Sequence, residues 1–107
     1  MSGPLGWDPS YRALILSRGA DWLHTITTRT APYPAGVAAW IVIRDSTNAT
    51  VLDTWNATCT TSSVSWAIPS ATADSIPENA RYQMFLQFPT SPTTEMEWCY
   101  GPVIRKP

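Results

Sequence analysis

The sequence is poor in the side chains that carry out chemistry. Its 107 residues include one histidine (His24), one lysine (Lys106), two cysteines and eight carboxylates. The carboxylates are scattered along the chain, without a glycine-rich phosphate loop or a nucleophile elbow. Two cysteines and one histidine fall short of a structural zinc set. We therefore expect neither an enzyme nor a metal or cofactor site.

Concentrated positive charge and long apolar runs are also missing. The formal net charge is -1, and the arginines are spread along the chain, so we expect no nucleic-acid partner. The opening MSGPLGWDPS lacks the basic start and apolar run of a signal peptide. No stretch approaches the roughly 20 apolar residues of a membrane span. We expect a soluble protein that is made in a cytoplasm and has no membrane partner.

The two cysteines, Cys59 and Cys99, are the minimum for one disulfide. If Trp66 points into the core, uninterrupted strand alternation turns Cys59 outward, and an inward Trp98 likewise turns Cys99 outward. A bulge would reverse either assignment. We expect two unlinked thiols, in keeping with a cytoplasmic origin.

What the chain does have is a series of short strands with apolar side chains on one face, separated by ten prolines and runs of threonine and serine. Strand signals that recur about every 8 to 12 residues are typical of a β-sandwich. The pattern predicts an all-β fold, a single immunoglobulin-like antiparallel β-sandwich of about seven or eight short strands. The strands are expected at residues 11–18, 21–29, 37–44, 51–58, 62–68, 80–88 and 95–105.

The remaining segments divide the chain into an arm and one domain. Residues 1–10 contain too many glycines and prolines for a strand and are expected to form an extended N-terminal arm. Residues 11–107 are expected to form the β-sandwich domain, with a short helical turn within 69–79 that connects the two sheets.

Alternation also predicts which side chains fill the core. One inter-sheet cluster is expected from side chains that share inward parity on three strands: Trp66, Tyr82, Met84, Leu86, Phe88 and Trp98. Val51 and Trp55 are expected on one common face of their strand. Strand 37–44 is apolar on both faces, which indicates that both faces are covered.

Two groups of polar side chains have the composition of catalytic sites. Ser17, Asp21 and His24 are the residue types of a hydrolytic triad, but Asp21 and His24 have opposite strand parity and leave the backbone on opposite faces. Glu95 and Glu97 share a face, and adjacent carboxylates on a terminal strand are usually solvated. We expect neither group to be catalytic.

The aromatic residues remain as candidates for binding. Trp7 lies in an irregular arm that cannot bury it by sheet packing, and Trp40 lies on the strand with two apolar faces. Large rigid side chains of this kind often dominate interface energetics. These positions require a covering surface, which is either another part of the chain, with the arm folded back over its own sheet, or another protein. For an interface with other proteins, the candidate residues are Trp7, Asp8, Pro9, Tyr11, Trp40 and Val42.

Several segments carry a family resemblance that spans residues 6 to 105. They are GWDPSYRALILSRGADWLHTI, PYPAGVAAWIVI, TWNAT, VSWAI, IPENARYQMFLQFP and YGPVIR. Together they resemble small β-sandwich proteins of long-tailed bacteriophages, most closely those of phages that infect actinobacteria, which are related to a phage collar protein domain.

This resemblance implies a structural protein of the virion that is present in many symmetric copies. Its partners would be capsid, collar or tail subunits, with the chain acting as a capsid decoration or minor capsid protein, or as a collar or minor tail protein. The competing function is a carbohydrate-binding module for host-surface glycans, with Trp55 or Trp40 as the stacking platform.

Overall fold

The computed structural model describes residues 10–27, 33, 35–89 and 94–107, and these residues form nine strand segments and one short helix. The elements are β1 (Ser10–Tyr11), β2 (Leu14–Ser17), β3 (Trp22–Thr27), β4 (Ala38–Arg44), β5 (Val51–Asn56), β6 (Thr58–Cys59), β7 (Ser63–Ile68), α1 (Ser70–Asp74), β8 (Arg81–Phe88) and β9 (Thr94–Lys106). The expected helical turn within 69–79 is therefore present as α1, and the all-β prediction is confirmed.

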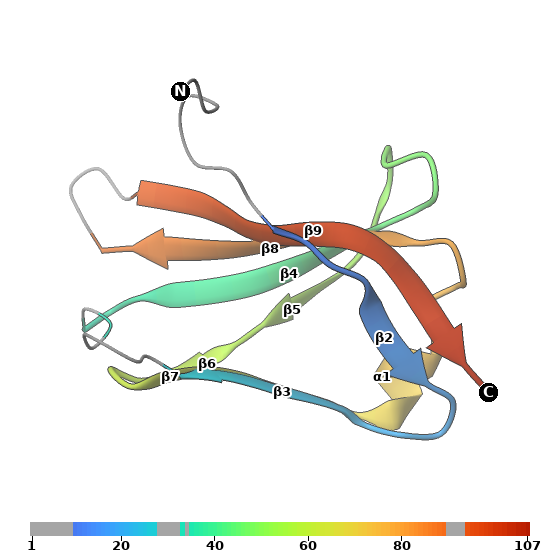
Figure 1. Cartoon of the computed structure of the whole chain (residues 1–107), viewed down its shortest axis with the longest axis horizontal. Helices are drawn as coiled ribbons and strands as arrows, with labels where there is room; N and C mark the ends of the chain where they lie inside the picture. Colours follow the sequence, from blue (N-terminus) through green and yellow to red (C-terminus); the bar gives the residue numbers. More distant parts are fainter. Residues whose placement is uncertain (1–9, 28–32, 34, 90–93) are drawn as a thin grey trace, which may run out of the picture.

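The strands form two sheets that pack face to face (Figure 1). The larger sheet has the order β1-β9-β8-β4-β5, with β2 also paired to β9, and the smaller sheet has the order β3-β7-β6. This confirms the β-sandwich, but the sandwich is not wholly antiparallel, because β1 and β2 both run parallel to β9. The strand expected at 11–18 is thus two short pieces separated by Arg12 and Ala13.

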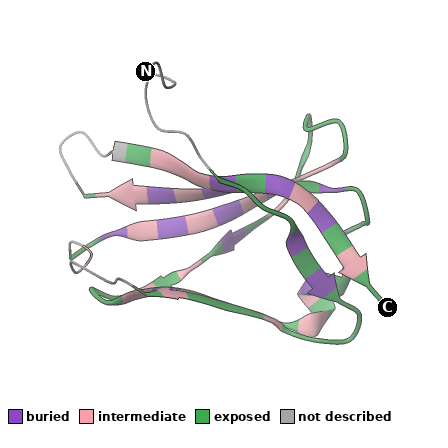
Figure 2. Ribbon diagram, viewed as in Figure 1, coloured by how far each residue is buried: buried purple, intermediate pink, exposed green. Residues whose placement is uncertain are grey.

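The core lies between the sheets, and alternation of side chains defines it. Along β4 and β8, buried residues alternate with half-buried ones (Figure 2). Of the six predicted core residues, Trp66, Tyr82, Met84 and Leu86 are buried, while Phe88 and Trp98 are partly buried and pack against the same cluster. The predicted core is therefore confirmed, with its two outermost members half-buried.

A bulge in β9 overturns the expected orientation of Cys99. Met84 pairs with Cys99, but the next residue, Phe85, pairs with Glu97, so Trp98 is an extra residue in the ladder. An extra residue reverses the alternation beyond it. As a result Cys99 faces the core and is only 9 % exposed, and it is not the outward thiol that uninterrupted alternation predicts.

A second bulge separates Val51 from Trp55. Ile43 pairs with Asp53 and Arg44 pairs with Val51, so Leu52 is the extra residue of β5. Val51 therefore lies beside Arg44 on the outer face, while Trp55 is buried. The prediction that Val51 and Trp55 share one face is wrong for this reason.

Cys59 also points toward the interior, against expectation. It pairs with the buried Val64 and packs against the core, because the chain reverses tightly where the Thr60 N–H donates to the Ser63 carbonyl (2.8 Å). Both cysteines are free thiols.

Polar contacts around α1 fix one end of the sandwich. The Arg105 guanidinium of β9 donates to the carbonyls of Ala73 and Asp74 at the end of the helix (3.1 and 2.9 Å). The Asp74 carboxylate accepts the Gly19 N–H, which lies in the link between β2 and β3. These contacts hold the β2–β3 link against α1 and so set the position at which β3 enters the smaller sheet.

Candidate docking surfaces

Aromatic side chains gather on the outer face of the larger sheet because the strand register aligns them. Tyr11 pairs with Tyr100, Tyr100 with Gln83, and Gln83 with Val42, so these four residues form one row across β1, β9, β8 and β4. The two tyrosine rings meet edge to face at 5.3 Å. Tyr11 is 64 % exposed and Tyr100 is 39 % exposed, so the row ends in a pair of accessible rings.

A second row runs beside the first. Trp40 pairs with Phe85, and their rings stack with centroids 5.7 Å apart; Phe85 in turn pairs with Glu97. Together the two rows place apolar side chains on a face that no other described element covers, since the smaller sheet and α1 pack on the other side. We call this set the outer aromatic strip: Tyr11, Trp40, Val42, Phe85 and Tyr100.

A polar network lies among these rings. The Arg44 Nε donates to the Gln83 Oε1 (3.2 Å), and the Gln83 Nε2 donates to the Glu97 carboxylate. The Glu97 carboxylate is therefore engaged by the Gln83 side chain on the sheet surface. This contact does not fit a catalytic pair with Glu95, which we did not expect. Apolar rings around satisfied polar groups resemble the composition of protein interfaces.

The structure brings three of the predicted interface residues together, since Tyr11, Trp40 and Val42 all belong to the strip. Trp7, Asp8 and Pro9 lie outside the described residues. Strand 37–44 was expected to be covered on both faces, but the described structure covers only its inner face with another layer. Trp40 and Val42 are half-buried by neighbours in their own sheet.

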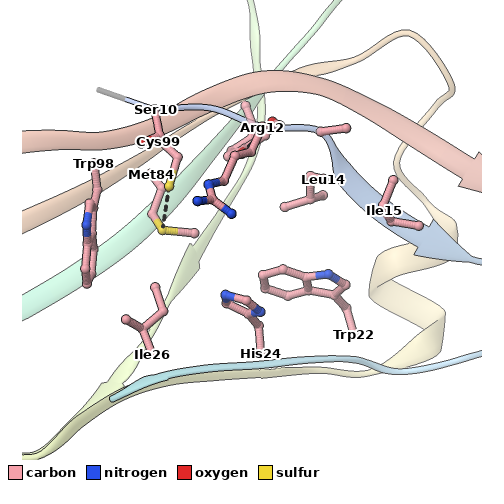
Figure 3. A pocket seen from close by; sticks show the side chains of 12 residues that line it. Ser10, Arg12, Leu14, Ile15, Trp22, His24, Ile26, Met84, Trp98 and Cys99 are labelled. Atoms are coloured by element: carbon pink, nitrogen blue, oxygen red, sulfur yellow. Dashed lines mark hydrogen bonds between the residues drawn. The ribbon is translucent and has the colours of Figure 1, made fainter. Parts of the chain in front are cut away.

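Sequence reasoning missed a second feature, a cleft between the two sheets. It has a volume of about 550 Å³ and lies between β3 on one side and β1 and β2 on the other (Figure 3). Its walls are mostly apolar: Ser10, Arg12, Ala13, Leu14, Ile15, Trp22, His24, Ile26, Tyr82, Met84, Trp98 and Cys99. Trp22, His24 and Ile26 alternate along β3 and so share a face, but only the strand order places this face beside a cleft.

The floor of the cleft is aromatic and its roof carries one guanidinium. His24 stacks on Trp22 with ring centroids 5.5 Å apart, and Trp22 also contacts the buried Trp66. The Arg12 side chain extends from the opposite wall toward these rings (Figure 3). The cleft therefore presents flat apolar surface next to a positive charge.

Burial favours the neutral forms of two groups that line the cleft, the Cys99 thiol and the Tyr82 hydroxyl. Burial raises the pKa of the Cys99 thiol, whose Sγ lies 3.7 Å from the Met84 Sδ. Burial also raises the pKa of Tyr82, whose hydroxyl donates to the Arg12 carbonyl (2.8 Å). Because the thiolate is the reactive form of cysteine, this thiol is a poor nucleophile near neutral pH. The arrangement is suited to binding an apolar group.

The three triad residue types are not assembled. The Asp21 carboxylate accepts the N–H of Ser70 at the start of α1 (2.7 Å), so it is engaged away from the His24 ring. In the part of the chain that the structure describes, no cluster of three or more histidine, cysteine or carboxylate side chains is placed to hold a metal ion. Within the same residues no helix has the length and apolar character needed to cross a membrane.

The two facing sheets and the exposed strip define a class, the small β-sandwich domain with an uncovered aromatic face. The family model described as "LtfC-like, beta-sandwich domain" matches residues 8–106. The chain belongs to this family, and the match covers nearly its whole length. A comparison with curated proteins gave no match.

Proposed function

We propose that this chain is a structural subunit of a tailed bacteriophage virion and that it docks on neighbouring subunits through the outer aromatic strip. The observation that carries the proposal is the strip itself, a cluster of rings on a sheet face that the described structure leaves uncovered. Membership of the LtfC-like family and the resemblance of the sequence to phage sandwich proteins support it.

Leaving the rings of the outer aromatic strip in contact with water costs free energy. Burying an aromatic side chain removes about 150–250 Å² from solvent, and such residues contribute most of the binding energy at many interfaces. A weakly charged domain with a ring-rich face is suited to contact with a repeating protein surface. The role we assign is an accessory one without enzymatic activity, as a decoration or minor capsid protein, or as a collar or minor tail protein, assembled after synthesis in the host cytoplasm.

The glycan-binding alternative loses one of its two platforms. Trp55 is only 3 % exposed, and its indole N–H donates to the Asp53 carboxylate (2.9 Å), so it cannot stack on a sugar. Trp40 is half-buried, and the Phe85 ring stacks against it. Protein docking would use the whole outer aromatic strip, whereas glycan binding would use only the part of the Trp40 indole that Phe85 does not cover.

Quantitative mass spectrometry of purified phage particles tests the proposal. We expect the protein in many copies, in a constant ratio to a major capsid or tail protein of the same particles. A non-structural phage protein measured in the same samples serves as the control and should be depleted by purification. Presence in infected-cell lysate together with absence from particles would contradict the proposal, and specific binding of host glycans by such a non-virion protein would favour the alternative.

A further inference from the structure

The inner face of the smaller sheet is incompletely covered along β3. Residues that pair directly across two antiparallel strands point to the same face of the sheet. The inward residues of β7 are buried, whereas their partners on β3 are half-buried or exposed. The pairs are Trp22 with Ile68, His24 with Trp66, and Ile26 with Val64. The described structure therefore covers β7 but leaves the inner face of β3 accessible from the cleft.

The two sheets differ in width, which explains this exposure. From β5 the larger sheet continues through β4, β8 and β9 to β1 and β2, whereas from β6 the smaller sheet continues through β7 and ends at β3. The sheets are level on the side where β5 passes into β6 through Ala57 alone (Figure 1). The larger sheet therefore extends beyond β3, and the cleft lies between β3 and the residues of this overhang, 10 and 12–15.

Among the outer strands, β3 has the least protection against pairing with another strand. Within the described residues nothing pairs with its second edge, and its ladder with β7 has no bulge. Short length, bulges and charged side chains commonly block such edges. β5 has the bulge at Leu52 and the Asp53 carboxylate, and β1, β2 and β6 have four residues or fewer. β3 has six residues, without lysine, proline or carboxylate, so its free N–H and C=O groups can accept a further strand.

The cleft defines the chemistry of the strand that would fit. A strand added to β3 turns every second side chain toward the cleft. Trp22 and Ile26 make the cleft apolar on both sides of His24, and the Arg12 guanidinium extends toward the His24 ring (Figure 3). Among the described residues that line the cleft there is no carboxylate. The inward position beside His24 therefore favours a carboxylate, and the inward positions on either side favour apolar side chains.

We propose that β3 accepts an extended strand of another virion protein, whose inward side chains are apolar on both sides of one carboxylate that pairs with Arg12. This inference rests on the proposed function, since it describes the segment that a neighbouring subunit would insert. A second copy of this chain fits less well through the same edge. Its β3 would turn only Trp22, His24 and Ile26 inward and would leave Arg12 without an anion.

A synthetic strand tests the site in the full-length protein. The probe is a seven-residue peptide with blocked ends, in which threonine alternates with valine, glutamate and phenylalanine at the second, fourth and sixth positions. We expect it to bind in an NMR titration and to slow hydrogen exchange at alternate amides of β3. The control peptide exchanges the glutamate with the threonine before it, which turns the carboxylate to the outer face at constant composition. It should bind about fivefold more weakly.

Charge exchange tests the contact with Arg12. Arg12→Glu should weaken binding of the glutamate peptide about tenfold, because it places like charges together. The same variant should bind more tightly to a peptide with lysine in place of the glutamate, which a merely structural role of Arg12 would not produce. Arg18→Glu changes an exposed arginine that does not line the cleft. This matched control should bind the glutamate peptide as the wild type does.

Several outcomes would overturn the proposal. They are no binding of the glutamate peptide at millimolar concentration, equal binding of the two peptides, and protection of a strand other than β3. Protection of alternate β3 amides without peptide would assign the edge to a second copy if it rises with protein concentration, and to the chain itself if it does not. All of these measurements use purified protein, so they can fail while the proposed virion role stands, and the reverse.

Discussion

At the scale of single residues, Gly101 has the clearest steric requirement. It pairs with Tyr82 across β8 and β9, and a Cβ at this position would lie 2.1 Å from the Arg12 carbonyl oxygen. The same oxygen accepts the Tyr82 hydroxyl. The absent side chain of Gly101 therefore makes room for the chain between β1 and β2, and this junction carries the Arg12 side chain into the cleft.

Gly101→Ala should destabilise the domain by about 1–3 kcal/mol, because the added methyl group forces the backbone near Arg12 to move. Denaturant unfolding measures the change. Gly19→Ala is the control, since nothing lies within 4 Å of its Cβ and only its positive φ of 77° is strained, which costs about 1 kcal/mol. A Gly101→Ala protein as stable as the wild type would show that β1 and β2 do not dock as described.

At the scale of elements, β7 and β8 carry the core. Trp66 of β7 is 2 % exposed and its indole N–H donates to the Trp55 carbonyl (3.0 Å), which links β7 to the larger sheet. Leu86 of β8 is buried among the same side chains. Core packing and a buried hydrogen bond thus both depend on the regular alternation of inward and outward side chains along these two strands.

Leu86→Ala should cost about 2–5 kcal/mol and Trp66→Ala about 3–5 kcal/mol, since both leave cavities. Trp66→Ala also removes the hydrogen bond from the indole to the Trp55 carbonyl, which places its cost at the upper end of the range. Leu23→Ala is the matched control, because Leu23 is 70 % exposed on β3, and its loss should change stability by less than about 0.5 kcal/mol. Unchanged unfolding midpoints in both core variants would refute the assignment of these strands to the core.

At the scale of the whole molecule, the sandwich is asymmetric. Its larger sheet exposes the aromatic strip, whereas the outer side of β3, in the smaller sheet, carries Leu23 and threonines. The larger sheet therefore presents the ring-rich outer face of the molecule, with Gln83 and Glu97 among the rings, and the cleft opens beside it at the edge formed by β1 and β2.

Tyr11→Ser should lower incorporation of the protein into phage particles without lowering its stability, because this ring is highly exposed and belongs to the strip. Leu23→Ser removes an equally exposed apolar side chain from the other sheet and should leave incorporation unchanged. The copy number per particle, measured by mass spectrometry after complementation of a phage that lacks the gene, checks both. Equal incorporation of the two variants would contradict docking through the strip.

The sequence by itself determined the class of fold and most of the core. The alternation in 80–88 and 62–68 assigned Tyr82, Met84, Leu86 and Trp66 to the interior, because a two-residue period has only two faces and the apolar one must leave water. The apolar residues on both faces of 37–44 likewise placed Trp40 and Val42 on a second apolar face of this strand.

Tertiary structure decided the features that depend on pairing between distant strands. Bulges at Trp98 and Leu52 reversed the faces of Cys99 and Val51, since a bulge is defined by the partner strand and leaves no mark in local alternation. The parallel pairing of β1 and β2 with β9 likewise joins segments at opposite ends of the chain. The cleft exists only because β2 and β3, neighbours in sequence, enter different sheets.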